Sequence, residues 1–240
     1  MYGYGYYGMG FFLDPTYILI LIGVVISLLA SAWVNSSMNK YSKIRNAYNM
    51  TGAQAAERIL HSEGLYNVRI ECLPDNQGDH YDPRTDTVRL SYQNYHNPSV
   101  TAVSVAAHEC GHAIQHAKGY APINIRAALV PVVNIGSALS MPLIFLGVLL
   151  SWNQVLIQIG IWAFSLTLLF QLVTLPVEFN ASRRALAKVE QYGILTQEER
   201  AGGKKVLTAA AFTYVAAVAA SALQLLRLVL LFGGNRRRDD

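Results

Sequence analysis

The sequence predicts a mainly α-helical integral membrane protein, with about four transmembrane helices and a small α+β module. Only 14% of its 240 residues are charged and 52% are hydrophobic, whereas a soluble domain has about 25% charged residues. The apolar residues are gathered in four long runs, and strand-like stretches lie between the first run and the second. These observations together indicate membrane helices that carry a compact polar module.

Four apolar runs are long enough to cross a bilayer, for which a helix needs about 20 residues. They cover approximately residues 17–34, 128–151, 155–175 and 206–232. Because only a short turn separates the second run from the third, we expect residues 128–175 to form a transmembrane hairpin. The segments outside the runs are residues 1–16, 35–127, 176–205 and 233–240.

The first run has one feature of a cleaved signal peptide. An Ala-Ser-Ala tripeptide at 30–32 resembles a signal-peptidase site. However, residues 1–16 contain no Lys or Arg, whereas a signal peptide begins with a basic region. The basic residues follow the run instead, between 40 and 45. We therefore expect a retained membrane anchor, preceded by a Gly/Tyr-rich segment to which no function is assigned.

Loop charges predict the orientation of the helices. Residues 35–127 contain nine Lys and Arg and residues 176–205 contain six, while 1–16 and the turn at 152–154 contain none. Four spans place both basic segments on one side, and the positive-inside rule makes that side cytoplasmic. The tail Arg236–Arg238 disagrees, because it would lie outside. We expect a multi-pass plasma-membrane protein with its module at the cytoplasmic face.

The cysteines and the net charge narrow the class of protein further. Cys72 and Cys110 are the only cysteines, too few for a disulfide framework. The net charge of +4 lies in loops beside membrane spans, where contact with anionic lipid explains it. We therefore expect the lipid bilayer, and no nucleic acid, among the partners.

The first part of the polar module is predicted to hold a short helix and two strands. Thr51 is placed to cap a helix over residues 53–63, and Gly64 ends it. The stretches 67–73 and 87–92 have the composition of strands, and the residues between them favour turns. The stretch 87–92 could be an edge strand that pairs with an extended peptide, an expectation that fails if this strand lies inside the sheet.

The next predicted helix begins after Ser99, ends before Gly119 and carries histidines at 108, 112 and 116. Consecutive residues of an α-helix differ by about 100° and 1.5 Å. His108 and His112 therefore lie about 40° and 6 Å apart, so both can bind one ion. His116 lies about 12 Å along the axis from His108, too far for one tetrahedral ion with Zn–N distances of about 2.0–2.1 Å. We therefore exclude His116 as a ligand and interpret it as a supporting residue or an ordinary polar one.

Glu109 completes a His-Glu-x-x-His motif and lies beside the two histidines, about 100° from His108. This is the zincin arrangement, with two nitrogen ligands for Zn²⁺ and a carboxylate that can take a proton from water. The opposite face of the helix is apolar and is predicted to be buried: Val103, Ala106, Cys110, Ala113, Ile114 and Ala117. Cys110 belongs to this face, so we interpret it as a packing residue rather than a nucleophile.

A catalytic zinc usually has three protein ligands, so the motif requires one more. After the predicted hairpin the chain returns to the same side of the membrane near Pro176, which we expect to end the third span before a further helix over 178–191. Glu178 is the first acidic residue after that span, and a carboxylate so close to an apolar run favours a charged partner. We predict Glu178 as the third ligand, against the alternative of an interfacial residue that marks a helix end. Thr196 and Glu199 form a capping box for the helix that leads into the last span.

Four stretches resemble the bacterial membrane-embedded neutral zinc metallopeptidases of the YugP-like family. They are DHYDPRTDTVRLSY at 79–92, HECGHAIQH at 108–116, PVEFNASRRA at 176–185 and KKVLTAAAFTYVAA at 204–217. The resemblance covers nearly the whole chain beyond about residue 16. It implies a membrane-embedded Glu-zincin that hydrolyses peptides or proteins, membrane proteins among them. One Zn²⁺ ion would be bound by His108, His112 and Glu178, with Glu109 as general base.

Two positions depart from the pattern of such relatives. Asn180 stands where an Asp is expected in the family, and Ser182 stands where HtpX-like proteases have a supporting Asp. Either change could weaken the support that orients a ligating histidine. A separate expectation concerns His80 and Tyr81, either of which could stabilise the oxyanion, or which could simply belong to a hairpin turn.

Two alternative functions use the same residues. A site-2-type intramembrane protease also has a His-Glu-x-x-His motif, but within a membrane span, and residues 97–119 lack such an apolar run. A zinc-binding scaffold without catalysis would keep the ligands but would not need Glu109. We therefore expect a zinc-dependent endopeptidase in which Glu109 takes a proton from zinc-activated water and passes it to the leaving amine.

Overall fold

The computed structural model describes residues 14–74 and 77–233. The predicted Gly/Tyr-rich segment up to residue 13 and the basic tail with Arg236–Arg238 lie outside the described residues. The chain forms two compact units. We call residues 30–129 and 172–215 the motif unit, and the described parts of 1–29, 130–171 and 216–240 the apolar unit.

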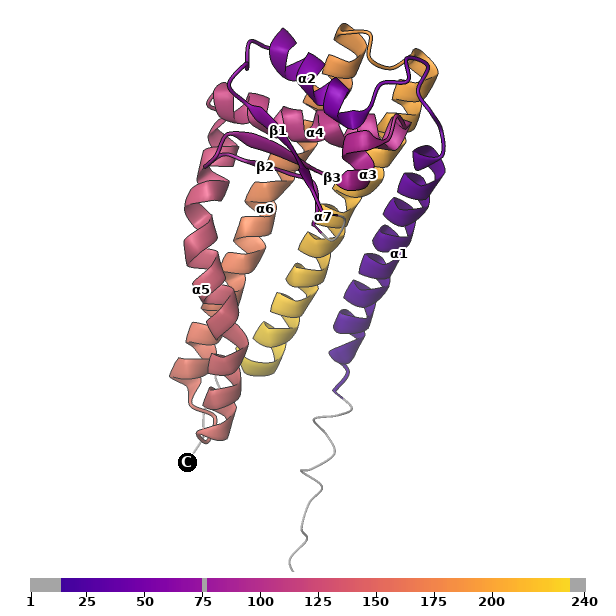
Figure 1. The fold of residues 1–240 in the computed structure, drawn as a ribbon. Helices are drawn as coiled ribbons and strands as arrows, with labels where there is room; N and C mark the ends of the chain where they lie inside the picture. Colours follow the sequence, from indigo (N-terminus) through magenta and orange to yellow (C-terminus); the bar gives the residue numbers. More distant parts are fainter. Residues whose placement is uncertain (1–13, 75–76, 234–240) are drawn as a thin grey trace, which may run out of the picture. The chain divides into compact units, whose positions relative to one another are not determined.

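Four helices are long and apolar enough to cross a membrane (Figure 1): α1 (Tyr17–Ser42), α5 (Ala121–Leu149), α6 (Gln154–Gln191) and α7 (Gln197–Phe232). Few side chains in their most apolar stretches are buried in the protein alone, as expected for helices that face lipid. The remaining elements are short and include a three-stranded sheet. The chain is therefore a mainly α-helical membrane protein with a small α+β module, as predicted.

The membrane-type helices extend beyond their apolar runs, and α6 shows the largest difference from the prediction. Pro176 lies inside α6, so the expected break between two helices at this residue is wrong. Proline removes one backbone hydrogen bond, but long membrane-type helices tolerate this because neighbouring helices and local adjustments satisfy the freed group. As a result, Glu178 is part of a continuous helix rather than the start of a new one.

The α+β module is built from three short helices and three strands: α2 (Gly52–Ser62), β1 (Arg69–Leu73), β2 (His80–Asp82), β3 (Thr87–Ser91), α3 (Tyr92–His96) and α4 (Val100–Ala117). Strand β3 lies between the other two, parallel to β1 and antiparallel to β2. The expectation that the stretch 87–92 is an edge strand is therefore wrong, because both edges of β3 are already paired. Strand β2 was predicted only as part of a turn, since three residues are too few for an alternating pattern.

Helix α4 packs its predicted apolar face against α2 and the sheet. Five residues of that face are at most 1% exposed: Val103, Ala106, Cys110, Ala113 and Ile114. The sixth, Ala117, is exposed because it lies in the last turn of the helix. Thr51 and Ser99 cap α2 and α4 through their hydroxyl oxygens, so the helix starts are as predicted. The buried back of α4 fixes which of its faces carries the histidines.

The apolar unit has a small core of its own, formed by Ile144, Ile157, Leu228 and Phe232. Arg227 is the one charged residue inside the predicted apolar runs. Its guanidinium lies 4.4 Å from the centre of the Tyr17 ring, a cation–π contact that offsets part of the cost of burying the charge.

Candidate metal centre

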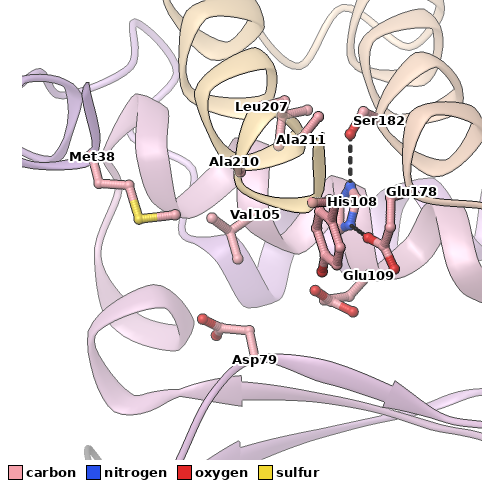
Figure 2. A pocket seen from close by; sticks show the side chains of 11 residues that line it. Met38, Asp79, Val105, His108, Glu109, Glu178, Ser182, Leu207, Ala210 and Ala211 are labelled. Atoms are coloured by element: carbon pink, nitrogen blue, oxygen red, sulfur yellow. Dashed lines mark hydrogen bonds and ion pairs between the residues drawn. The ribbon is translucent and has the colours of Figure 1, made fainter. Parts of the chain in front are cut away.

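The three predicted ligands lie together in the motif unit. His108 and His112 come from α4, and Glu178 comes from α6. Their ligand atoms all lie within 4.8 Å of one another. Glu178 Oε2 is 3.3 Å from His108 Nε2 (Figure 2) and 3.6 Å from His112 Nε2. Two imidazole nitrogens and one carboxylate oxygen form a donor set typical of a zinc site with an open fourth position.

Helices α4 and α6 come close at this point because Gly111 has no side chain. A Cβ atom on Gly111 would lie 2.6 Å from the carbonyl oxygen of Ala181, much closer than two non-bonded atoms allow. Ala181 is itself fully buried. Small residues on both helices thus let the two backbones approach, which brings Glu178 opposite the two histidines.

Each imidazole is oriented by a partner on its other nitrogen. Ser182 Oγ lies 3.1 Å from His108 Nδ1, and Gln115 Oε1 lies 3.0 Å from His112 Nδ1. When these oxygens accept a hydrogen bond from Nδ1–H, the lone pair of each Nε2 is directed to the centre of the cluster. Both rings are therefore supported in the tautomer that binds a metal ion.

Gln115 is held in place by a second set of hydrogen bonds. Its side chain is fully buried, and its Nε2 donates to Val177 O at 2.8 Å and to Asn180 Oδ1 at 3.0 Å. Arg184 Nε donates to the same Asn180 oxygen at 2.7 Å. The amide oxygen of Asn180 thus accepts both bonds in the way that a carboxylate would. Asn180 and Ser182, which depart from the relatives' pattern, both contribute to orienting the histidines.

The carboxylate of Glu178 shows whether these residues suit a cation. Its side chain is 3% exposed, and its Oε2 accepts no well-formed hydrogen bond from any described residue. The Oε1 atom lies 3.7 Å from Arg126 Nη1. An ionised oxygen buried in this way is unfavourable unless positive charge lies against it. A zinc ion held by the two Nε2 atoms and Oε2 would supply that charge, so the residues fit the metal.

The electrostatics of His112 lead to the same conclusion. Burial disfavours its imidazolium form, but Glu178, Glu109 and Gln115 outweigh burial and raise the pKa of His112. Carboxylates around two buried imidazoles create a site that attracts positive charge. A divalent cation meets this requirement better than a proton, because it contacts all three ligand atoms at once.

Glu109 lies beside the ligands, on the wall of a cavity of about 180 Å³. It is 7% exposed, and no hydrogen bond to another described residue restrains its carboxylate. The apolar part of the cavity lining consists of Met38, Val105, Leu207, Ala210 and Ala211. Figure 2 shows Met38 and Asp79 at the end of the cavity away from Glu178. The arrangement offers a carboxylate next to the ligands and an apolar lining in the same cavity.

The other predicted candidates lie elsewhere. His80 Nδ1 is 2.9 Å from Gly78 O, and the Tyr81 hydroxyl donates to Asp86 Oδ1 at 2.8 Å. His116 Nδ1 is 3.3 Å from the Tyr81 hydroxyl, outside the cluster of metal ligands. Neither His80 nor Tyr81 lines the cavity. His80 and His116 are exposed, and the ring of Tyr81 packs against the hydrophobic core.

Three residues near the ligands were not predicted: Gln115, Arg126 and Tyr214. Gln115 follows His112 by three residues on the same helix face, a spacing that could have suggested it. Arg126 comes from α5 and nothing in its local sequence marks it. Tyr214 comes from α7 and lies in the stretch 204–217 that carries the resemblance, but no pattern singled it out within that stretch. Cys110 is fully buried beneath the site, and burial raises the pKa of its thiol, which fits a packing role.

Comparisons with known proteins agree with this geometry. Residues 16–233 match a family model described as "Putative neutral zinc metallopeptidase". The chain is 44% identical over 190 residues to "Putative membrane protease YugP" of Bacillus subtilis (strain 168), a match that covers 79% of this chain and 84% of that protein. No solved structure matches the chain.

Proposed function

The chain belongs to a family of neutral zinc metallopeptidases, and we propose that it is a membrane-anchored endopeptidase in which His108, His112 and Glu178 hold one zinc ion. The observation that carries the proposal is the buried Glu178 Oε2, which faces both Nε2 atoms at 3.3 and 3.6 Å. Four long apolar helices support the membrane anchor. The resulting activity is hydrolysis of peptide bonds.

The bound zinc supplies Lewis-acid chemistry, which lowers the pKa of a water molecule to about 7 and polarises a peptide carbonyl. Glu109 takes the proton from the attacking water and delivers it to the leaving amine. Its carboxylate is free for this role because no described residue hydrogen-bonds to it. Ser182 and Gln115 keep the two imidazoles fixed, so the ligands need no rearrangement during the reaction.

The proposed substrates are peptides or proteins with apolar side chains near the scissile bond, including membrane proteins. The apolar wall formed by Met38, Val105, Leu207, Ala210 and Ala211 supports this class. The basic segments 35–127 and 176–205 support a site at the cytoplasmic face of the plasma membrane. The excess of basic residues is assigned to lipid contact, so nucleic acid is not expected as a partner.

The two alternative functions have less support. An intramembrane site would need its motif helix within a span, but α4 is not among the described helices that are long and apolar enough to cross a membrane. A zinc scaffold usually has four protein ligands, whereas the cluster offers three within the described part of the chain. Three ligands and a free carboxylate favour catalysis.

The substitution Glu109→Gln tests the proposal. The full-length protein in detergent or lipid should retain one zinc per chain, measured by metal analysis, and should lose peptide cleavage by about 10²-fold or more because the general base is absent. Glu57→Gln, on the exposed side of α2, is the matched control and should cleave like the wild type. Full activity of Glu109→Gln would refute the proposed mechanism. A wild-type protein that holds zinc without cleaving any peptide would favour the scaffold.

A further inference from the structure

Peptide hydrolysis places negative charge on the carbonyl oxygen, and a hydrogen-bond donor beside that oxygen lowers the barrier. The cavity next to the metal ligands has few side chains that can donate. Three of its polar residues are carboxylates, which accept only: Asp79, Glu109 and Glu178. Ser182 accepts from His108 Nδ1 and keeps its own O–H, but it lies at the ring nitrogen opposite the Nε2 that faces Glu178. Tyr214 is the remaining donor among the described residues that line the cavity.

Tyr214 is carried by a rigid element. It follows Leu207 by seven residues and Ala211 by three, a spacing that puts all three on one face of α7. All three line the cavity. Nearer the start of the helix, Gly203 packs against α4 so closely that a Cβ atom there would collide with Ser104 Oγ. The phenol is therefore positioned by helix packing rather than by a loop.

Tyr214 lines the same cavity as the proposed third ligand and the proposed base. Its side chain forms a hydrogen-bonding contact with Glu178, the proposed third ligand, and also interacts electrostatically with Arg126 and with Glu109, the proposed base. The residue is 37% exposed, so a bound peptide can reach it. A donor in the cavity that holds the ligand and the base can reach the carbonyl oxygen of a substrate bound there.

The two donors suggested by the sequence are less suited. His80 Nδ1 faces Gly78 O, and the Tyr81 hydroxyl is used in a hydrogen bond to Asp86. Both residues lie outside the cavity lining. Either would have to move before it could approach a substrate bound at the ligands, whereas Tyr214 already lines the cavity.

We propose that Tyr214 is a catalytic residue whose hydroxyl donates a hydrogen bond to the carbonyl oxygen of the peptide bond undergoing hydrolysis. This inference rests on the proposed function. The phenol keeps its proton throughout, and no covalent bond forms or breaks at Tyr214. Its contribution is a hydrogen bond that strengthens as negative charge develops on the oxygen.

The alternative role for Tyr214 is to position Glu178, and the two roles predict different measurements. The experiment uses the full-length zinc-loaded protein and the substitution Tyr214→Phe, which keeps the ring. A catalytic donor predicts that kcat falls by about 10²-fold, while KM and the zinc content stay at wild-type values. A positioning residue would instead lower the affinity for zinc, measured by competition with a chelator, and that result would overturn the inference.

A binding measurement provides a readout that does not depend on turnover. A phosphonamidate peptide carries a tetrahedral oxyanion, so its Kd should rise by about the same factor as kcat falls when Tyr214 becomes Phe. In the Glu109→Gln background, the Kd of the uncleaved parent peptide should not change. If Tyr214→Phe raised the Kd of the phosphonamidate and the Kd of the parent peptide by the same factor, the inference would be overturned. Tyr214 would then contribute equally to the binding of any peptide.

Tyr81→Phe is the matched comparison, since it removes a hydroxyl that the structure places outside the cavity. We expect it to leave kcat and the phosphonamidate affinity at wild-type values. Loss of activity in Tyr81→Phe with full activity in Tyr214→Phe would overturn the inference while the proposed function stands. A wild-type protein that holds zinc and cleaves nothing would instead refute the proposed function itself.

Discussion

Gly111 of α4 and Ala181 of α6 meet backbone to backbone: a Cβ atom on Gly111 would lie 2.6 Å from Ala181 O. The contact lies at the metal site, because Gly111 precedes His112 and Ala181 precedes Ser182. The separation of the two backbones here determines whether Glu178 reaches the imidazoles. The cluster of metal ligands therefore requires glycine at position 111.

Gly111→Ala should weaken zinc binding. Alanine favours a helix by about 1 kcal/mol over glycine, but overpacking at a backbone contact costs about 1–3 kcal/mol and is relieved only if α6 moves away. We expect the affinity for zinc, measured by chelator competition, to fall by at least about tenfold as the ligands separate. The control is Gly78→Ala, where an added Cβ meets no atom within 4 Å. Wild-type zinc affinity in Gly111→Ala would show that the crossing of the helices does not constrain the site.

Ser182→Ala should also weaken zinc binding, by a different route. His108 would lose the partner of its Nδ1 atom, and loss of such a partner lowers metal affinity by about 10–100-fold. Ser182→Asp offers a charged acceptor at the same position, and a charge-assisted hydrogen bond is about twice as strong as a neutral one. The zinc affinity of Ser182→Asp should therefore match or exceed that of the wild type. Equal affinities of the Ala and Asp variants would show that this hydrogen bond is not needed.

Glu63 links the ends of the two ligand-bearing helices. Its side chain is 7% exposed and pairs with Lys118 at 3.1 Å, just after α4, and with Lys188 in the last turn of α6. The hydroxyl of Tyr192 donates to its Oε1 at 2.5 Å. Burial opposes the charged form, but the bonds from Lys188, Tyr192 and Lys118 outweigh it and lower the pKa of Glu63 to about 2.

This low pKa predicts a pH-dependent stability. Because the folded-state pKa lies below the unfolded value of 4.5, the contribution of Glu63 is fully present above pH 4.5 and is lost as pH falls towards 2. Glu63→Gln should lower the free energy of unfolding by about 2–3 kcal/mol at pH 7 and much less near pH 2. Thermal unfolding in detergent across this range measures the difference.

Glu71→Gln is the control for Glu63, because the Glu71 side chain is 42% exposed and an ion pair at that exposure contributes about 1 kcal/mol or less. If wild type and Glu63→Gln lose stability in parallel between pH 7 and pH 2, the contacts of Glu63 do not stabilise its charged form. The difference in free energy of unfolding between Glu63→Gln and Glu71→Gln would then measure the part of the loss that comes from packing of the Glu63 side chain.

The sequence was sufficient for those features that depend on local patterns. Hydropathy located the four long helices, and helical spacing separated His108 and His112 from His116. The prediction of Glu178 as a ligand also used the return of the chain to the same side of the membrane after a hairpin. The structure places the Glu178 carboxylate beside both histidines. Each of these inferences uses neighbours on one element or the order of elements along the chain.

The features that escaped prediction depend on packing between distant segments. The short strand β2 acquires its conformation by pairing with β3, and Pro176 stays within α6 because its surroundings tolerate the missing hydrogen bond. Arg126 and Tyr214 approach Glu178 from two other helices. No periodicity in a single sequence reports such contacts, because they arise only when the helices are assembled.

The apolar wall of the cavity predicts a preference among substrates. Ala210 and Ala211 of α7 leave room beside the ligands, and Leu207, Val105 and Met38 complete an apolar surface. We expect peptides with Leu or Phe next to the scissile bond to be cleaved with a kcat/KM at least about tenfold above those with Asp or Lys, because burying an unpaired charge against this wall is unfavourable.

Ala210→Phe should lower the cleavage of peptides that have a large side chain beside the scissile bond, without disturbing the metal ligands. The added ring would occupy the space beside the apolar wall, so kcat/KM for a Phe peptide should fall by about 10–200-fold, while that for the corresponding Ala peptide changes little. Ala201→Phe, on an exposed turn of the same helix, controls for the effect of a large side chain on α7. A wild-type enzyme that cleaves charged and apolar peptides equally well would show that this wall does not contact the substrate, because contact with an apolar surface must discriminate between them.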